Sequence, residues 1–316
     1  MADKPSDEIK TVSPVEKSEK VETTPVVKKR ITIMSGVNVR SKSKLRSSRV
    51  GKLEFGTVIK ELERSRRKAK IRGSRNYWYK IEMPNGKVGW TFGSLSTSFD
   101  EKQKGQIYLQ MARERLQKKL NWSNQIGLLD FIARAKKEVR SSPEISVELV
   151  LLQLSSLQKM LASDDYKRSP RKKNWLKKQE QQEIIFFADS DWVINAKPFW
   201  RIHDAYYPLQ FAERVAWAGA NLPLGEKCEG SIECALELAN NTTTKYLKYY
   251  PRGKYVEEAL DDIAELLNSN KVIEMSQESD LPRLFAVLQA IVNRTNHFKK
   301  TLVLNKIEKL QQQLVK

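Results

Sequence analysis

The apolar pattern of this chain changes abruptly near residue 100. Between residues 31 and 99, apolar residues come in short runs interrupted by glycines, whereas from Asp100 onward they recur at helical spacing. The first pattern is typical of short strands in a small barrel or sandwich, and the second of amphipathic helices. A chain of 316 residues is long enough for two folded units. We therefore predict a multidomain protein, with an all-β domain over residues 31–99 and an all-α domain over residues 100–316.

Residues 1–30 precede both domains and contain no aromatic side chain. They are rich in Lys, Glu, Ser, Thr and Pro, and such a segment buries too little apolar surface to offset the entropy of ordering. We expect a disordered tail. No apolar secretory signal is visible in it. Either the protein is cytosolic, or a signal or lipid anchor has been removed from the chain.

Start signals for helices occur in the second domain. Asp100 can cap a helix that runs through Leu120, and Ser142 with Pro143 can open another. The junction around residues 99–104 is short, so we expect the two domains to touch. No repeat period is visible, and a long solenoid is therefore not expected. Further helices are predicted over residues 124–139, 175–195, 205–220, 231–249, 254–268, 281–295 and 297–315.

A turn signal within the β domain, Pro84-Asn85-Gly86, joins two strand-like segments over residues 78–83 and 87–92. Asn-Gly tolerates the positive φ angles of a type I′ turn, so we predict a tight hairpin. Alternation along the first segment places Tyr79 on the buried face of the sheet and Trp78 on the wet face.

Five short motifs in this region resemble, in order, the bacterial SH3-like (SH3b) domains. The resemblance implies a small barrel of secreted or envelope proteins that often serves as a targeting or wall-binding module. The motifs are VNVRS at 37–41, GKL at 51–53, FGTV at 55–58, YWYKI at 77–81, and PNGK at 84–87 followed by GW at 89–90 and FG at 92–93.

A further segment, residues 245–255, resembles the helix–turn–helix of tetratricopeptide-type repeats in bacterial envelope lipoproteins. Pro251 cannot continue a helix, and Gly253 permits a left-handed exit. The resemblance implies one tetratricopeptide-like hairpin near residues 231–268. The whole layout is similar to uncharacterised bacterial envelope proteins, which implies an architecture and no activity.

Candidate ligand-binding residues lie in the SH3-like region. Exposed aromatic rings beside polar groups suit stacking against a sugar or a peptide, although a structural role in the core is the alternative for the aromatic residues. The predicted ligand-binding residues are Asn38, Arg40, Tyr77, Trp78 and Trp90.

Positive charge is concentrated in the same region. The formal net charge of the chain is +19, and residues 31–100 hold 16 basic and 5 acidic residues, whereas residues 198–316 hold 15 of each. The basic loop at residues 64–75 is not part of the SH3-like pattern. It is either a solvated hairpin tip or a salt-sensitive binder of wall polymer, anionic lipid or nucleic acid. Its seven cations are Arg64, Arg66, Arg67, Lys68, Lys70, Arg72 and Arg75.

Two cysteines, Cys228 and Cys234, are separated by five residues. We predict a disulfide between them, with two reduced thiols as the alternative. A bridge over so short a loop contributes about 2 kcal/mol and indicates export from the cytosol. No CxxC or HExxH spacing occurs, so neither a metal site nor a cofactor is expected.

Together these features predict a non-enzymatic binding or scaffold protein of the cell envelope, periplasmic or extracellular. The SH3-like module would bind cell-wall polymer or a partner peptide, and the helical domain would bind protein. Two alternatives stay open. One is a cytosolic nucleic-acid-binding adaptor that uses the basic loop, and the other is a wall hydrolase, which would need a Glu or Asp in a cleft that the sequence does not identify. Separately, His203 is either a base oriented by Asp204 or a histidine with ordinary packing at the start of a helix. No apolar run is long enough to cross a membrane, and the oligomeric state is not predicted.

Overall fold

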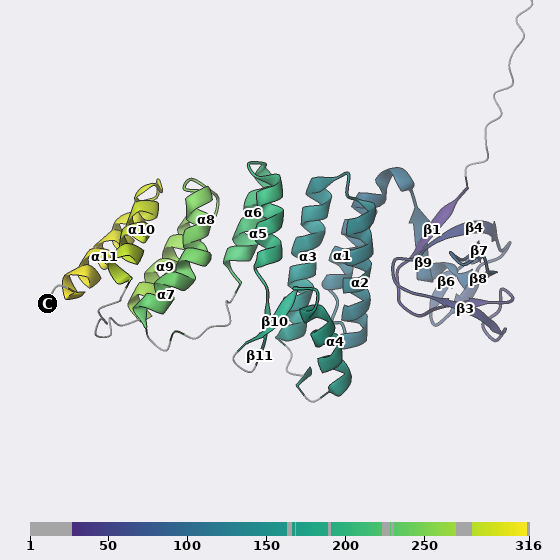
Figure 1. Ribbon diagram of the computed structural model, residues 1–316. Coiled ribbons are helices and arrows are strands. Elements are labelled where there is room, and N and C mark those ends of the chain that lie inside the picture. Colours follow the sequence, from purple (N-terminus) through teal and green to yellow (C-terminus); the bar gives the residue numbers. More distant parts are fainter. Residues whose placement is uncertain are drawn as a thin grey trace, which may run out of the picture.

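The structure is a computed structural model that describes residues 27–162, 166–167, 169–188, 191–222, 228, 231–269 and 280–314. A β domain over residues 29–99 stands at one end of a single row of helices (Figure 1). The predicted multidomain class is therefore confirmed: an N-terminal antiparallel SH3-like sheet is followed by a largely helical region.

Seven strands of the β domain form one antiparallel sheet in the order β3-β2-β8-β7-β4-β1-β9. Successive side chains of a strand point to opposite faces, which puts Val39, Ile59 and Ile81 into one buried core. A small two-stranded hairpin, β5–β6, is inserted between β4 and β7. The strands are β1 (Lys29–Thr32), β2 (Val37–Arg40), β3 (Arg49–Leu53), β4 (Val58–Arg64), β5 (Ala69–Ile71), β6 (Ser74–Asn76), β7 (Trp78–Glu82), β8 (Val88–Phe92) and β9 (Ser96–Phe99).

The hairpin between β7 and β8 forms as predicted, but its turn differs. Gly86 has a φ of 78°, whereas Asn85 is not in the left-handed region, and the amide of Gly86 donates to the carbonyl of Met83 at 2.9 Å. This is a type I turn followed by a glycine bulge, not the predicted type I′ turn. A type I′ turn instead closes β5–β6, where Arg72 and Gly73 have φ angles of 48° and 83°.

The expectation of a wet face at Trp78 is wrong. Its side chain is 4 % exposed, and its ring packs edge-on against Phe92 at a centroid distance of 5.5 Å. Tyr79 is buried as well, so both faces of β7 are covered at this end. Simple alternation fails here because a small, strongly bent sheet with an inserted hairpin covers its strands from two sides.

The first strand begins inside the predicted tail of residues 1–30, the rest of which, residues 1–26, lies outside the described residues. Arg30 is 8 % exposed although it is charged. Its guanidinium donates to the Ser96 side chain and carbonyl, both at 2.9 Å, pairs with Glu61 at 3.2 Å and lies 3.8 Å from the Tyr79 ring centroid. These partners lie far away in sequence, so the tail composition gives no hint of them.

The helical region runs away from the β domain, its helices standing side by side in roughly chain order (Figure 1). The predicted helix over residues 175–195 is wrong in its second half, where Ile185–Ala188 and Asp191–Ile194 pair as the antiparallel strands β10 and β11. Both segments contain aromatic and β-branched residues, which favour strands. The elements are α1 (Lys104–Leu116), α2 (Trp122–Glu138), α3 (Pro143–Leu161), α4 (Pro170–Glu180), β10 (Ile185–Ala188), β11 (Asp191–Ile194), α5 (Lys197–Tyr206), α6 (Gln210–Ala220), α7 (Ile232–Asn241), α8 (Thr243–Tyr249), α9 (Val256–Ser269), α10 (Leu281–Asn293) and α11 (Lys300–Leu314).

Several residues predicted to start or end helices lie at these positions but make other contacts than expected. Asp100 accepts a hydrogen bond from the Lys102 amide at 2.9 Å, but it caps a short 3-10 turn that leads into α1. Pro143 is the first residue of α3, while the Ser142 side chain makes no capping bond. Gly253, between α8 and α9, does not have a positive φ. It is instead packed closely, because an added Cβ would lie 2.4 Å from the Tyr246 hydroxyl.

The β domain and the first three helices share one apolar core. The Phe55 ring packs edge-on against Phe131 of α2 at 4.7 Å, and Tyr108 of α1 contacts both Phe131 and Phe99, at 5.5 and 5.8 Å. Arg134 adds a hydrogen bond of 2.9 Å to the Phe55 carbonyl. The expected contact between the domains is thus a buried aromatic cluster.

Two glycines with similar positive φ angles allow the cost of backbone strain to be measured apart from the cost of disturbing this packing. Gly56 and Gly86 have φ angles of +72° and +78°; a Cβ at Gly56 would lie 2.1 Å from the Phe131 ring, whereas one at Gly86 meets nothing within 4 Å. We expect Gly86→Ala to lower the free energy of unfolding by about 1–2 kcal/mol through left-handed strain alone. Gly56→Ala should cost about 1–3 kcal/mol more, because Phe131 must move. Chemical denaturation measures both values, and equal losses would contradict the tight interdomain packing.

Candidate binding cleft of the β domain

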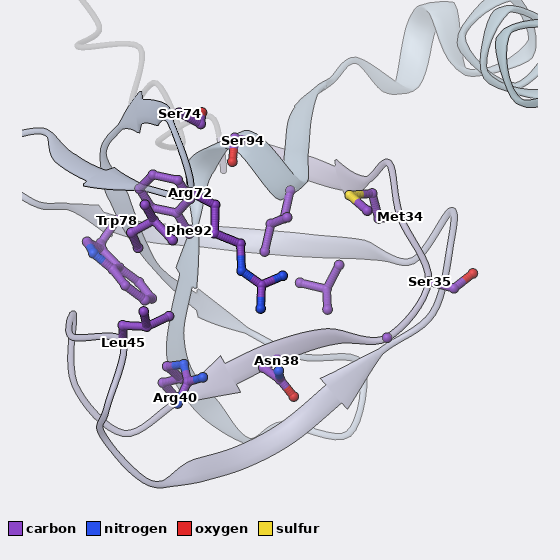
Figure 2. Close-up of a pocket in the computed structure, with 14 residues that line it drawn as sticks. Met34, Ser35, Asn38, Arg40, Leu45, Arg72, Ser74, Trp78, Phe92 and Ser94 are labelled. Carbon is purple, nitrogen blue, oxygen red and sulfur yellow. The ribbon is translucent and has the colours of Figure 1, made fainter. Parts of the chain in front are cut away.

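A cleft of about 470 Å³ lies in the β domain between the start of β2 and the tip of the β5–β6 hairpin. Figure 2 shows Arg72 reaching across it from the hairpin, with Trp78 and Phe92 on one side and Asn38 on the β2 side. The lining residues are Met34, Ser35, Gly36, Val37, Asn38, Arg40, Leu45, Ile71, Arg72, Ser74, Trp78, Phe92, Ser94 and Leu95.

The β2 wall carries two of the predicted ligand-binding residues. Val37 and Val39 are buried and alternate with the half-buried Asn38 and Arg40, so the polar pair is turned away from the core. The Arg40 Nη1 donates to the Ser47 carbonyl at 2.7 Å, which ties this guanidinium to the loop before β3. A guanidinium has five N–H donors, and one fixed bond orients the group while leaving donors for a ligand.

The hairpin wall supplies the second guanidinium. The type I′ turn places Arg72 at the tip, where its side chain is exposed and lines the cleft. The signal for this turn was present in the sequence, since a glycine in the second position of a two-residue loop favours it. It is hidden by the surrounding cations, which make residues 64–75 look like an irregular loop.

An apolar surface completes the cleft. Trp78 and Phe92 present the edge of the core, and two unpredicted residues form an open rim: Met34 is 46 % and Leu45 is 52 % exposed. Large exposed apolar side chains next to a concavity are typical of binding sites. Neither stands out in the sequence, because an isolated apolar residue in a loop carries no pattern.

The other two predicted ligand-binding residues lie outside the cleft. Tyr77 lies at the base of the β5–β6 insertion, where its ring centroid is 4.5 Å from the Arg64 guanidinium and 5.3 Å from the Lys68 ammonium. Trp90 is half-buried on β8, opposite Lys80 and Arg40 in the strand register. The structure therefore gathers Asn38, Arg40 and Trp78 in the cleft and places Tyr77 and Trp90 elsewhere.

The seven predicted anion-binding cations are all exposed. Of these seven residues, only Arg72 lines the cleft. The others, Arg64, Arg66, Arg67, Lys68, Lys70 and Arg75, lie along the inserted hairpin and the segment leading to it. They form a positively charged surface on and before the inserted hairpin. Such a surface attracts anions without fixing their orientation.

The two remaining predicted sites lie in the helical region. Cys228 and Cys234 form the predicted disulfide, with Cα atoms 5.4 Å apart. His203 is fully buried, and its Nδ1 and Nε2 lie 2.8 Å from Asp204 and 3.1 Å from the Tyr250 hydroxyl. Both ring nitrogens are thus engaged, and His203 links α5 to the end of α8 instead of facing a substrate.

Metal-binding clusters and membrane spans are absent from the described parts of the chain. No group of three or more His, Cys, Asp or Glu side chains there is arranged to hold a metal ion. None of the described helices is both long and apolar enough to cross a bilayer.

Comparison with known proteins agrees with the β-domain geometry. Residues 35–97 match the family model of the bacterial SH3 domain. The match contains every residue of the cleft except Met34. No curated protein matches the chain. The molecule therefore carries a bacterial SH3 domain, a class of binding module commonly related to the cell wall, joined to a helical region.

The burial of the two tryptophans predicts unequal structural roles. Trp78 is 4 % exposed, so Trp78→Ala should lower the free energy of unfolding by about 3–5 kcal/mol. Trp90 is only half-buried, and Trp90→Ala should cost about 1 kcal/mol, the average for point substitutions. Urea denaturation followed by circular dichroism tests this ranking, and the reverse order would contradict it.

Proposed function

We propose that this chain is a cell-envelope binding protein whose SH3 domain holds a carboxylate-bearing wall peptide or partner peptide in the cleft. The observation that carries the proposal is the pairing of two guanidinium groups, Arg40 and Arg72, with the aromatic wall of Trp78 and Phe92. The membership of residues 35–97 in a family of binding modules supports the same role.

The chemistry of the lining favours a peptide with a free carboxylate. Guanidinium groups bind carboxylates through two parallel hydrogen bonds, which fixes the orientation of the ligand. The apolar rim of Met34 and Leu45 suits methyl groups or the flat face of a sugar. Peptide stems of bacterial cell walls combine carboxylates with small apolar side chains, and they match this lining in both respects.

The role we propose involves no bond-making. Among the described residues that line the cleft, none has a carboxylate, histidine or cysteine side chain, so these residues supply no general acid, general base or thiol nucleophile of the usual kinds. His203, the best candidate base in the sequence, has no solvent-exposed surface. A wall hydrolase is therefore the weaker interpretation.

The location we propose is outside the cytosol, because the Cys228–Cys234 disulfide is a bond that reducing compartments do not maintain. Protein isolated from its native cells with thiols blocked at lysis should show no alkylated cysteine by mass spectrometry. Both cysteines should become alkylated only after reduction. Alkylation before reduction would favour the cytosolic adaptor instead.

The binding role predicts a specific loss on neutralising Arg72. Arg72→Asn removes the charge but keeps a residue that tolerates the positive φ of the turn. We expect it to weaken retention on purified peptidoglycan about tenfold, since a charge-assisted hydrogen bond to a ligand is worth about 1.5–3 kcal/mol. Co-sedimentation at 50 and 300 mM salt measures the effect.

The matched control is Arg66→Asn, which changes the net charge equally at an exposed cation outside the cleft. It should lower retention less than twofold at 300 mM salt. Equal losses in both variants would show that charge alone is responsible. Anionic vesicles and single-stranded DNA serve as parallel probes, and retention on either in place of peptidoglycan would overturn the wall assignment.

A further inference from the structure

We propose that a groove across the second half of the helix row binds an acidic amphipathic peptide segment of a partner protein. The groove consists of two adjoining hollows. One, of about 500 Å³, lies between α8 and α10, and the other, of about 540 Å³, lies between β10–β11, α5 and α7. Lys245 lines both, so the two hollows meet at its side chain. This inference goes beyond the proposed function, because it concerns the helical region and not the cleft of the β domain.

The side chains that line the groove carry a net positive charge. Among the described residues that line it, five are cations and none is a carboxylate. Four of the five belong to residues 198–316, which hold 15 basic and 15 acidic residues. Many of the acids are gathered on α9, whose residues line neither hollow. The lining is therefore positively charged, although the region around it is neutral overall, because it contains five cations. They are Lys197, Lys245, Lys248, Arg283 and Arg294.

The floor of the groove is apolar and follows helical spacing. Leu284, Val287 and Ile291 lie on one face of α10, and Val287 is 39 % exposed. Arg283 and Arg294 lie at the two ends of this face, eleven residues apart, which corresponds to about 16 Å along a helix. Leu238 and Trp200 continue the apolar surface in the neighbouring hollow.

Lys245 lies at the centre of this arrangement. Its ammonium is 4.1 Å from the centroid of the Trp200 ring. Burial lowers the pKa of Lys245, an effect that nearby Asp204 opposes and Lys248 reinforces. A partly desolvated cation gains more from an incoming carboxylate than one surrounded by water. Arg283 differs, since it already pairs with Asp280 at the end of the groove.

An acidic peptide fits these features better than a nucleic acid does. A phosphate backbone is bound by cations and needs no apolar floor, whereas an amphipathic segment provides carboxylates for the rim and apolar side chains for the α10 face. The distance between the two end cations suits a helix of about three turns.

The test uses a fluorescein-labelled 14-residue peptide with Leu at three- and four-residue spacing and Glu at most other positions. A second peptide has Gln in place of every Glu. Fluorescence anisotropy with the full chain at 50 mM salt should show binding of the Glu peptide that is at least about tenfold tighter than that of the Gln peptide, a difference of about 1.4 kcal/mol. Raising the salt to 300 mM should weaken it.

Charge reversal localises the site. Lys248→Glu with Arg294→Glu should weaken binding of the Glu peptide at least tenfold. The matched control, Arg252→Glu with Lys309→Glu, makes the same change in net charge at exposed residues outside the groove and should stay within twofold of the parent. Val287→Gln tests the floor and should weaken binding with no change in net charge.

The proposal is overturned if the Glu peptide does not bind, if the Gln peptide binds equally, or if both double variants lose binding to the same extent. It is also overturned if the Lys248→Glu and Arg294→Glu double variant loses binding to oligo-dT or anionic vesicles but keeps binding to the Glu peptide. Arg72→Asn separates this inference from the cleft. This variant should bind the Glu peptide as tightly as the parent does. If the parent protein binds the Glu peptide but not peptidoglycan, only the proposed wall ligand is refuted.

Discussion

The aromatic contact between Phe55 and Phe131 is the interaction on which the architecture depends, because it joins two domains with different folding patterns. The ring of Phe131 occupies the space that a side chain at position 56 would need, so the glycine and the ring fit only together. Tyr108 extends the cluster, and its hydroxyl donates to Glu138 at 2.5 Å. Burial, together with Glu138, raises the pKa of Tyr108 above its usual range. The cluster is thus apolar except for the Tyr108 hydroxyl, which is hydrogen-bonded to Glu138. It positions the β domain on α1 and α2.

Beyond this junction, helices along the row pack on two sides, each side into a different apolar core. Neighbouring residues of a helix belong to different cores: Leu128 faces the β-domain side and Leu129 the next helices, and Phe199 and Trp200 divide in the same way. Each of these helices is apolar on two sides and contributes residues to two neighbouring cores. This is the construction of quasi-one-dimensional proteins, in which stability comes from contacts between neighbours. Glu148 strengthens one such step, because it pairs with Arg113 of α1 and Arg214 of α6.

The domain layout was predictable because it depends on local patterns: glycine-punctuated short runs for the sheet and three- and four-residue spacing for the helices. The position of Trp78 was not predictable, since its burial depends on Phe92, a partner set by strand register. The same holds for Arg30, whose partners lie 31 and 66 residues away. The row of helices was not predicted, because helices with two apolar faces can stack in a row without any repeat in the sequence. The predicted site residues that line the cleft are Asn38, Arg40, Arg72 and Trp78, whereas the rim residues Met34 and Leu45 were not predicted.

The two proposed surfaces are placed at different positions on one continuous body. The cleft is lined by residues of the β domain, and the groove by residues of β10, β11, α5, α7, α8 and α10. The β domain stands at one end of the row of helices, and α10 lies toward the other end (Figure 1). Three apolar cores overlap between them through α2, α3, α5 and α6, so no flexible linker separates the surfaces within the described residues. A rigid connection fixes the distance between two bound partners, and it permits simultaneous binding only when the partners match that distance. If both surfaces bind as proposed, the packed helices between them set the separation of the two partners.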